Sequence, residues 1–183
     1  DVSGRRHSGV LTGDDMAKWR ASYDDPQTYD FHGYTVMKTG PWGQGPVLLQ
    51  QLALLKEYGL KAMDPTGPDF VHVVVEATKL AFADREAFYG DPNFVDTPME
   101  TLLSDTYNDA RRGFIDMDKE SLALRPGKID GYGGKIDYAA HVAAGSQDFA
   151  KFGIGEPTVG KQGQVQGDTC HVDVIDRHGN MVA

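Results

Sequence analysis

The sequence predicts an α+β fold that is mostly helical with a few strands, and two kinds of pattern support this prediction. Apolar residues recur at helical spacing in residues 46–58 and 68–89. Residues 171–176 instead alternate between apolar and polar side chains, which is typical of a strand with one buried face. Because 40% of the 183 residues are hydrophobic, the chain can also fill a core.

The first sixty residues predict a helix, a strand and a second helix. Thr12 can cap a helix over residues 11–19, and residues 34–37 have the composition of a short strand. After a turn rich in Gly and Pro, Pro46 is suited to the start of the next helix and Gly59 to its end.

The middle of the chain predicts further helices and then a loop. Residues 70–75 have strand propensity, but the apolar pattern continues beyond them, which favours one long helix from about 68 to 89. Shorter helices are expected over residues 97–103 and 104–114. Residues 117–167 are rich in Gly, Asp and Lys and show no sustained periodicity, so we predict a long loop there.

The last residues predict a β-hairpin. The strand at 171–176 places Val172 and Val174 on one face, and residues 177–180 form a tight turn. The turn leads directly into Met181 and a second short strand.

Composition excludes several classes of function. The net charge of −9, from 27 acidic and 18 basic residues, argues against nucleic-acid binding, which requires a basic surface. A single cysteine, Cys170, rules out an intramolecular disulfide and a thiolate-rich metal site, but it leaves the redox compartment open. No apolar run approaches the roughly 20 residues needed to span a membrane.

Thr169 stands where the predicted loop meets the predicted strand, a position that suits a nucleophile released by cleavage of its own chain. A threonine hydroxyl is a weak nucleophile and needs a proton acceptor within hydrogen-bonding distance. If the Asp168–Thr169 bond is cut, the new α-amino group, with a pKa of about 7.7–8.0, can be that base. From the residues alone, the commoner role for Thr169 is that of a β-branched strand residue.

Four blocks of the sequence favour the role of nucleophile for Thr169. Residues 9–16 read Gly-Val-Leu-Thr-Gly-Asp-Asp-Met, 32–36 read His-Gly-Tyr-Thr-Val, and 76–95 contain Ala-Asp-Arg and Gly-Asp-Pro-Asn-Phe. The run 169–183 begins Thr-Cys-His and continues through an apolar strand to Asp-Arg-His-Gly-Asn-Met-Val. In this order the blocks resemble the gamma-glutamyltranspeptidase family, whose small subunit begins Thr-Thr-His. They cover nearly the whole chain apart from the predicted loop.

The resemblance implies a four-layer αββα N-terminal-nucleophile hydrolase fold and a gamma-glutamyltransferase activity. Thr169 matches the catalytic threonine, and Asp168–Thr169 is the bond that cleaves itself. In the family, this threonine forms a gamma-glutamyl-enzyme intermediate that water or an amine resolves. The substrate is therefore expected to be a small gamma-glutamyl or similar acyl amide, with no cofactor and no metal. Many family members are periplasmic or extracellular.

The resemblance also divides the chain. Residues 1–116 correspond to a helical large-subunit region, 117–168 to a loop leading to the cleavage site, and 169–183 to the first strands of the small subunit. The substrate-binding arginine of the family and its oxyanion glycines match no residue of this chain. We therefore expect a fragment whose partner is the remainder of the small subunit and which alone is uncleaved and inactive. The alternative is a non-catalytic homologue that binds a ligand without turnover.

Two departures from the family pattern put the donor specificity in doubt. Cys170 replaces the second threonine, and as a thiol it is an alternative nucleophile, although strand alternation points it away from the face of Thr169. Residues 42–45, Trp-Gly-Gln-Gly, replace the usual Pro-Ser-Ser-Gly-Gly. Trp42 and Gln44 could line a substrate entrance or simply form a turn.

The remaining candidates have simpler interpretations. His171 is expected to be a strand histidine with a local hydrogen bond. Asp84 and Arg85 could bind substrate, but a structural ion pair with a helix end is favoured. Asp173 and Asp176 lie on opposite faces of the predicted strand without a third ligand, which does not make a metal site.

Overall fold

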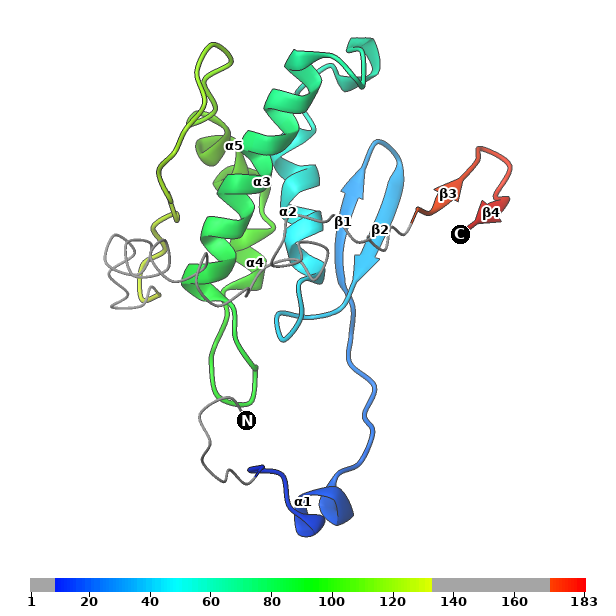
Figure 1. Ribbon diagram of the computed structural model, residues 1–183, viewed down its shortest axis with the longest axis vertical. Coiled ribbons are helices and arrows are strands. Elements are labelled where there is room, and N and C mark those ends of the chain that lie inside the picture. The colour runs from blue at the N-terminus through cyan, green and yellow to red at the C-terminus, as the bar shows by residue number, and fades with distance from the viewer. Residues whose placement is uncertain (1–8, 133–171) are drawn as a thin grey trace, which may run out of the picture. The chain divides into compact units, whose positions relative to one another are not determined.

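The computed structural model describes residues 9–132 and 172–183. The chain divides into two units, Asp1–Gly134 and Lys135–Ala183, which are described separately. The first unit contains five α-helices, one 3₁₀ turn and a β-hairpin among its described residues, and the second contains a small β-hairpin (Figure 1). The predicted α+β content, mostly helical with a few strands, is confirmed for the described residues.

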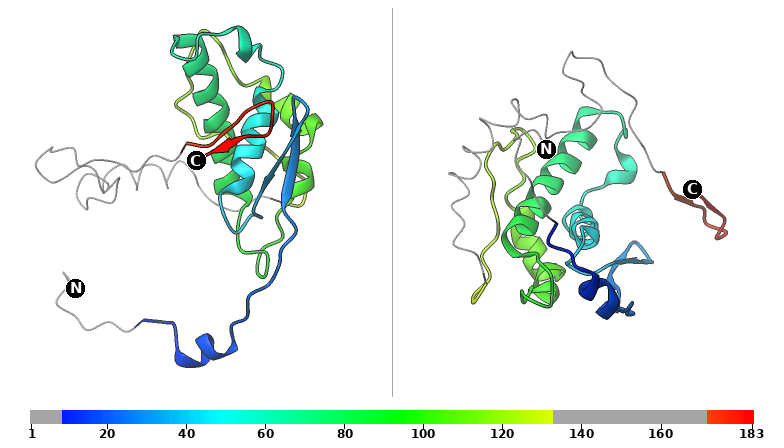
Figure 2. Two further views of the ribbon diagram at one scale, coloured as in Figure 1. Left: turned by 90° about the vertical axis from the view of Figure 1, so that its right-hand side faces the viewer. Right: turned by 60° about the horizontal axis from the view of Figure 1, so that its bottom comes forward.

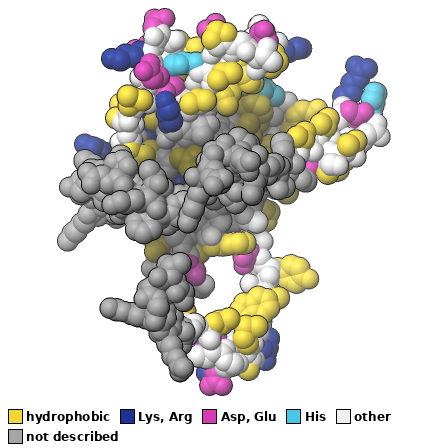
Figure 3. Space-filling model, in the orientation of Figure 1, with side chains coloured by type: hydrophobic (Ala, Val, Ile, Leu, Met, Phe, Trp, Pro, Cys, Tyr) yellow, Lys and Arg dark blue, Asp and Glu magenta, His cyan; other side chains and the backbone are white. Residues whose placement is uncertain are grey.

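Helix α1 (Gly13–Lys18) has the N-terminal cap that the sequence predicts. The Thr12 hydroxyl accepts a hydrogen bond from the Asp15 N–H at 3.2 Å, and the Asp15 carboxylate accepts one from the Thr12 N–H at 2.8 Å. This reciprocal pair is a capping box. The helix buries no residue, and large apolar side chains remain exposed on and around it (Figure 3): Val10, Leu11, Met16, Trp19 and Tyr23.

Strands β1 (Gln27–Phe31) and β2 (Tyr34–Lys38) form an antiparallel hairpin in which Phe31 faces Tyr34. The two turn residues, His32 and Gly33, have φ of 49° and 88°. Positive φ at both positions matches the right-handed twist of the strands. The sequence predicts only the second strand, because His-Gly is not one of the usual dipeptides for this turn.

Helix α2 (Gly45–Leu55) lies at the centre of the first unit, between the β1–β2 hairpin and helix α3 (Pro68–Phe88) (Figures 1 and 2). The two helices share the main apolar cluster, whose buried members are Val47, Leu54, Leu55, Val73, Ala77, Leu80 and Ala81. The long helix predicted over residues 68–89 is therefore confirmed, and its apolar face packs against α2 to form the core.

The end of α2 differs from the prediction. The helix stops at Leu55 rather than near Gly59, and a 3₁₀ turn (Leu60–Ala62) follows. Arg112, from helix α5 (Asp105–Arg112), donates hydrogen bonds to the carbonyls of Ala53 at 2.8 Å and Leu54 at 2.9 Å. A side chain from a distant helix thus satisfies carbonyls that would otherwise lack partners.

The two short helices predicted near residues 97–114 are both present. Helix α4 (Met99–Leu102) precedes α5, and Ser104 caps α5 by accepting a hydrogen bond from the Tyr107 N–H at 3.3 Å. Within the described ranges, no helix is both long enough and apolar enough to cross a membrane.

Replacing Leu80 by Ala should lower the free energy of unfolding by about 2–5 kcal/mol, because its side chain is fully buried and leaves a cavity between α2 and α3. Leu122→Ala is the matched control, since Leu122 is 93% exposed and its truncation should change stability by less than about 0.5 kcal/mol. Urea unfolding of the two variants measures both values. Equal losses would contradict the position of the core.

Candidate functional site

The predicted nucleophile and its neighbours, Asp168, Thr169, Cys170 and His171, lie outside the described residues. Their roles therefore stay predictions. The structure describes three features that bear on function: the hairpin that follows Thr169 in sequence, a concave surface around Trp42, and two buried carboxylates on α3.

The predicted C-terminal hairpin is confirmed, with β3 (Val174–Ile175) paired antiparallel to β4 (Met181–Val182). Asp176 organises its turn. Its carboxylate accepts hydrogen bonds from the backbone N–H groups of His178 at 2.8 Å and Asn180 at 3.0 Å, and from the Asn180 side chain at 2.8 Å. These donors, the Asn180 side chain first, hold the pKa of Asp176 below its ordinary value.

The Asp176 carboxylate is thus occupied by its own turn. Among the residues that the structure describes, no three His, Cys, Asp or Glu side chains gather where they could hold a metal ion. The strand is also shorter than predicted, since only Val174 and Ile175 pair in the first arm.

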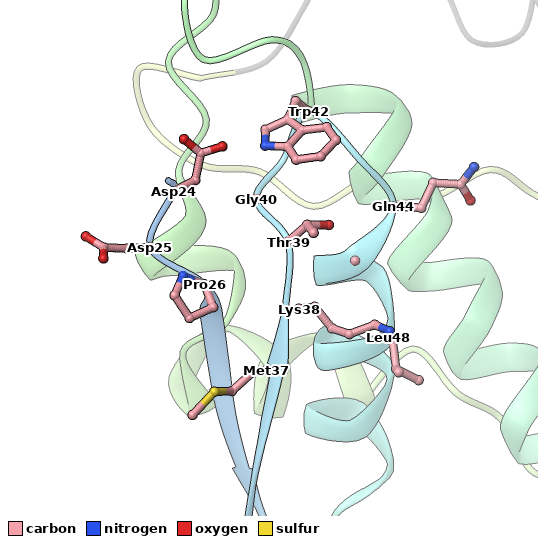
Figure 4. A pocket seen from close by; sticks show the side chains of 11 residues that line it. Asp24, Asp25, Pro26, Met37, Lys38, Thr39, Gly40, Trp42, Gln44 and Leu48 are labelled. Atoms are coloured by element: carbon pink, nitrogen blue, oxygen red, sulfur yellow. The ribbon is translucent and has the colours of Figure 1, made fainter. Parts of the chain in front are cut away.

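Trp42 and Gln44 lie in the turn between β2 and α2, and both line a pocket of about 660 Å³ (Figure 4). Asp24 lies on the same side as the Trp42 ring, whereas Gln44 points away from the ring. Trp42 is 58% exposed and lines two neighbouring pockets as well, one of them beside Arg85. The interpretation of Trp42 as part of an entrance is therefore compatible with its position, as is a role in the turn.

Close backbone packing fixes this turn. The Gly43 N–H donates to the Gly40 carbonyl at 3.1 Å, which bends the chain back toward α2. At Gly45, a Cβ atom would lie 2.8 Å from the Lys38 Cβ and 2.9 Å from the Thr39 carbonyl oxygen. Only glycine allows the first turn of α2 to approach the end of β2 this closely.

Asp84 is fully buried in α3 and accepts four hydrogen bonds. The donors are the Gln50 side chain at 2.6 Å, the Tyr107 hydroxyl at 3.0 Å, the Arg111 guanidinium at 3.1 Å and the Gly127 N–H at 2.6 Å. Burial raises the pKa of the Asp84 carboxyl, and the charge of Arg111 opposes that rise.

Glu76, two turns earlier on α3, is equally buried. Its carboxylate binds Lys79 at 2.6 Å, the Ser121 N–H at 3.1 Å and the Arg125 guanidinium at 3.1 Å. Burial acts to raise the pKa of Glu76, but the Lys79, Ser121 and Arg125 donors together bring it below its ordinary value.

The structural interpretation of Asp84 is confirmed, since it forms a buried ion pair with Arg111 in the last turn of α5. Arg85 takes no part in this pair and instead binds the neighbouring Glu86. Sequence reasoning missed Arg111 and Glu76, because nothing in the local sequence indicates which charged residues are buried.

Comparison with known proteins decides the family. Residues 3–183 match the model of a protein family described as gamma-glutamyltranspeptidase. The chain belongs to this family. The resemblance that the four sequence blocks predicted is thereby confirmed.

Several relatives align with almost the whole chain. The glutathione hydrolase proenzyme of Bacillus subtilis subsp. natto is 28% identical over 96% of this chain and 27% of its own length. The acylase ACY 1 proenzyme of Pseudomonas sp. (strain SE83) is 27% identical over 97% of this chain and 26% of its own. The solved structure of LmbA2991T421A is 47% identical, with a TM-score of 0.71, over 99% of this chain and 28% of its own. The chain thus spans about a quarter of the length of these relatives.

Replacing Gly45 by Ala should destabilise the first unit by about 1–3 kcal/mol, because the added methyl group collides with the backbone of Thr39. Gly13→Ala is the control, since a Cβ there meets nothing within 4 Å, and it should be neutral or slightly stabilising. Thermal unfolding compares the variants. A neutral Gly45→Ala would show that the turn relaxes without cost.

Acid should open the C-terminal turn only below the ordinary carboxyl pKa of about 3.9. Because the folded pKa of Asp176 is lowered, the turn gains stability above the unfolded pKa and loses it as pH falls through the folded value. NMR titration of the His178 and Asn180 amides follows this transition. A midpoint at or above the ordinary value would contradict the hydrogen bonds, and Asp176→Ala should remove the transition.

Proposed function

We propose that the whole protein is a gamma-glutamyltransferase-like enzyme with Thr169 as its nucleophile. The observation that supports this most strongly is the family match over residues 3–183, which includes Thr169 and the block beginning Thr-Cys-His. The relatives named glutathione hydrolase and acylase both act, by those names, on amide bonds.

The enzyme first cleaves itself. The Thr169 hydroxyl oxygen attacks the carbonyl carbon of Asp168, and the acyl group moves from the nitrogen to the oxygen as an ester. Water then hydrolyses the ester, so that Asp168 gains a terminal carboxylate and Thr169 a free α-amino group. The word proenzyme in the names of the relatives supports such a maturation step.

The same threonine then performs turnover. Its α-amino group accepts the hydroxyl proton while the oxygen attacks the acyl carbon of the substrate amide. The proton passes to the departing amine, and an acyl ester remains on Thr169. Water or a second amine attacks this ester, receives the acyl group and returns the proton to the threonine. Neither step requires a cofactor or a metal.

The proposed architecture follows from membership of the family. Residues 1–116 form the helical part of the large subunit, 117–168 lead to the cleavage site, and 169–183 contribute the first strands of the small subunit. The remainder of the small subunit completes a four-layer αββα sandwich and the oxyanion site. We expect the 183-residue chain alone to be uncleaved and inactive.

The substrate class is a small gamma-glutamyl or related acyl amide. The acylase relative supports acyl groups other than gamma-glutamyl, and the departure at residues 42–45 points in the same direction. Because Trp42 is exposed and lines three pockets, it is the residue through which this protein would recognise a different donor or acceptor.

Thr169→Ala should abolish both self-cleavage and turnover in the full-length protein, a loss of at least about a thousandfold in kcat. Cys170→Ser is the matched control and should retain cleavage and most of the activity. Intact mass shows the cleavage directly, since the smaller piece must begin at Thr169. A wild-type protein that stays in one piece and inactive would favour the non-catalytic homologue, whereas activity in Thr169→Ala would move the nucleophile to Cys170.

A further inference from the structure

The residues that follow α5 are attached to the helices of the first unit largely through polar groups. From residue 113 to 132 they contain no helix and no strand beyond one isolated bridge, between Asp116 and Lys119. Ile115 packs against the core, but the leucines farther along contribute little burial, since Leu122 is 93% and Leu124 is 37% exposed. Contacts other than apolar ones must therefore help to hold residues 121–127.

Polar side chains of α3 and α5 form hydrogen bonds with the backbone of residues 121–127. Ser121 donates its N–H to Glu76, and its carbonyl accepts a hydrogen bond from Lys79 at 2.9 Å. Six residues later, Gly127 donates its N–H to Asp84 at 2.6 Å. We call Glu76, Asp84 and their partners Lys79, Arg111 and Arg125 the carboxylate clamp.

Two arginines complete the clamp. Arg111, bound to Asp84, also donates to the carbonyl of Arg125. Arg125 in turn binds Glu76 through its guanidinium and donates to the Phe114 carbonyl at 2.8 Å. The two carboxylates are eight residues apart, about 12 Å along the helix, so they hold the segment at two separated points.

The fit at Gly127 is specific for glycine. A Cβ atom at this position would lie 1.9 Å from the Tyr107 hydroxyl oxygen, which itself donates to Asp84. The segment therefore passes directly over the buried acid, and no other residue could do so without displacing Tyr107.

The contribution of the clamp to holding residues 121–127 depends on whether the chain has been cut at Asp168–Thr169. In the uncut chain, residues 121–127 are tied at both ends, to α5 on one side and through Thr169 to the following strands on the other. After cleavage at Asp168–Thr169 the second tie is gone. The covalent link to α5 remains, and the described contacts that then hold the segment on the helical body are those of the clamp, together with the hydrogen bond from the Tyr132 hydroxyl to Asp96 at 2.8 Å.

We propose that the carboxylate clamp retains the C-terminal tail of the large subunit after self-cleavage, with Glu76, Asp84 and Arg125 as positioning residues. The inference rests on the proposed function, because it requires the cut before Thr169. Its effect is to keep residues 121–127 docked on α3 when the tail becomes a free chain end.

Trypsin digestion of the full-length protein tests this proposal at Lys128, which is exposed and directly follows the clamp. Cutting there requires local release of the segment. In the processed protein, Asp84→Asn and Arg125→Met should speed cleavage after Lys128 by tenfold or more. In the uncleaved Thr169→Ala background the same changes should speed it less than threefold.

Arg125→Met keeps the test valid if Asp84→Asn fails to fold, because Arg125 is partly exposed. Asp109→Asn removes an exposed ion pair with Arg112 and should leave all rates unchanged. Equal acceleration in both backgrounds, or none in the processed protein, would overturn the clamp while leaving the proposed function intact. A full-length protein whose intact mass shows no cut would instead overturn both.

Discussion

The buried ion pair between Asp84 and Arg111 is the interaction on which the arrangement of the first unit depends. It joins α3 to α5, and through Gln50 it also reaches α2. A charge of this kind, withdrawn from water, is tolerated only when its hydrogen-bonding capacity is filled. Four donors from three different segments, namely α2, α5 and the chain at Gly127, meet that requirement, so those segments cannot move independently of one another.

This constraint explains why the core and the polar network coexist along one helix. The apolar face of α3 packs on α2 through Val73, Ala77 and Leu80. Glu76 and Asp84 emerge on an adjoining face, where the chain after α5 returns. One helix therefore supplies both the non-directional packing of the core and the directional contacts that fix a segment without secondary structure.

Local sequence patterns predicted most of the helices because their signals are local. The Thr12 cap, Pro46 and the apolar periodicity after Pro68 all act within one or two turns. The sequence did not predict strand β1, whose pairing depends on an uncommon His-Gly turn, or the end of α2, which depends on Arg112. Contacts between residues far apart in the sequence leave no periodic signal.

In the candidate site, too, features with a local signal could be predicted from the sequence and features that depend on distant contacts could not. Thr169 could be singled out only by resemblance, since a threonine before a strand has no distinctive chemistry by itself. The hairpin after it was predictable, because Asp176, Gly179 and Asn180 are turn residues with a local mechanism. The burial of Glu76 and Asp84 was not, because burial is decided by the whole tertiary arrangement.

The termination of α2 by Arg112 has a consequence for the order of folding during synthesis. The carbonyls of Ala53 and Leu54 receive their donors from a residue that the ribosome adds 58 residues after Leu54. Until that residue emerges, the last turn of α2 has only water to satisfy it and frays. The central helix of this unit is therefore completed late, by the docking of α5, although its sequence is translated early.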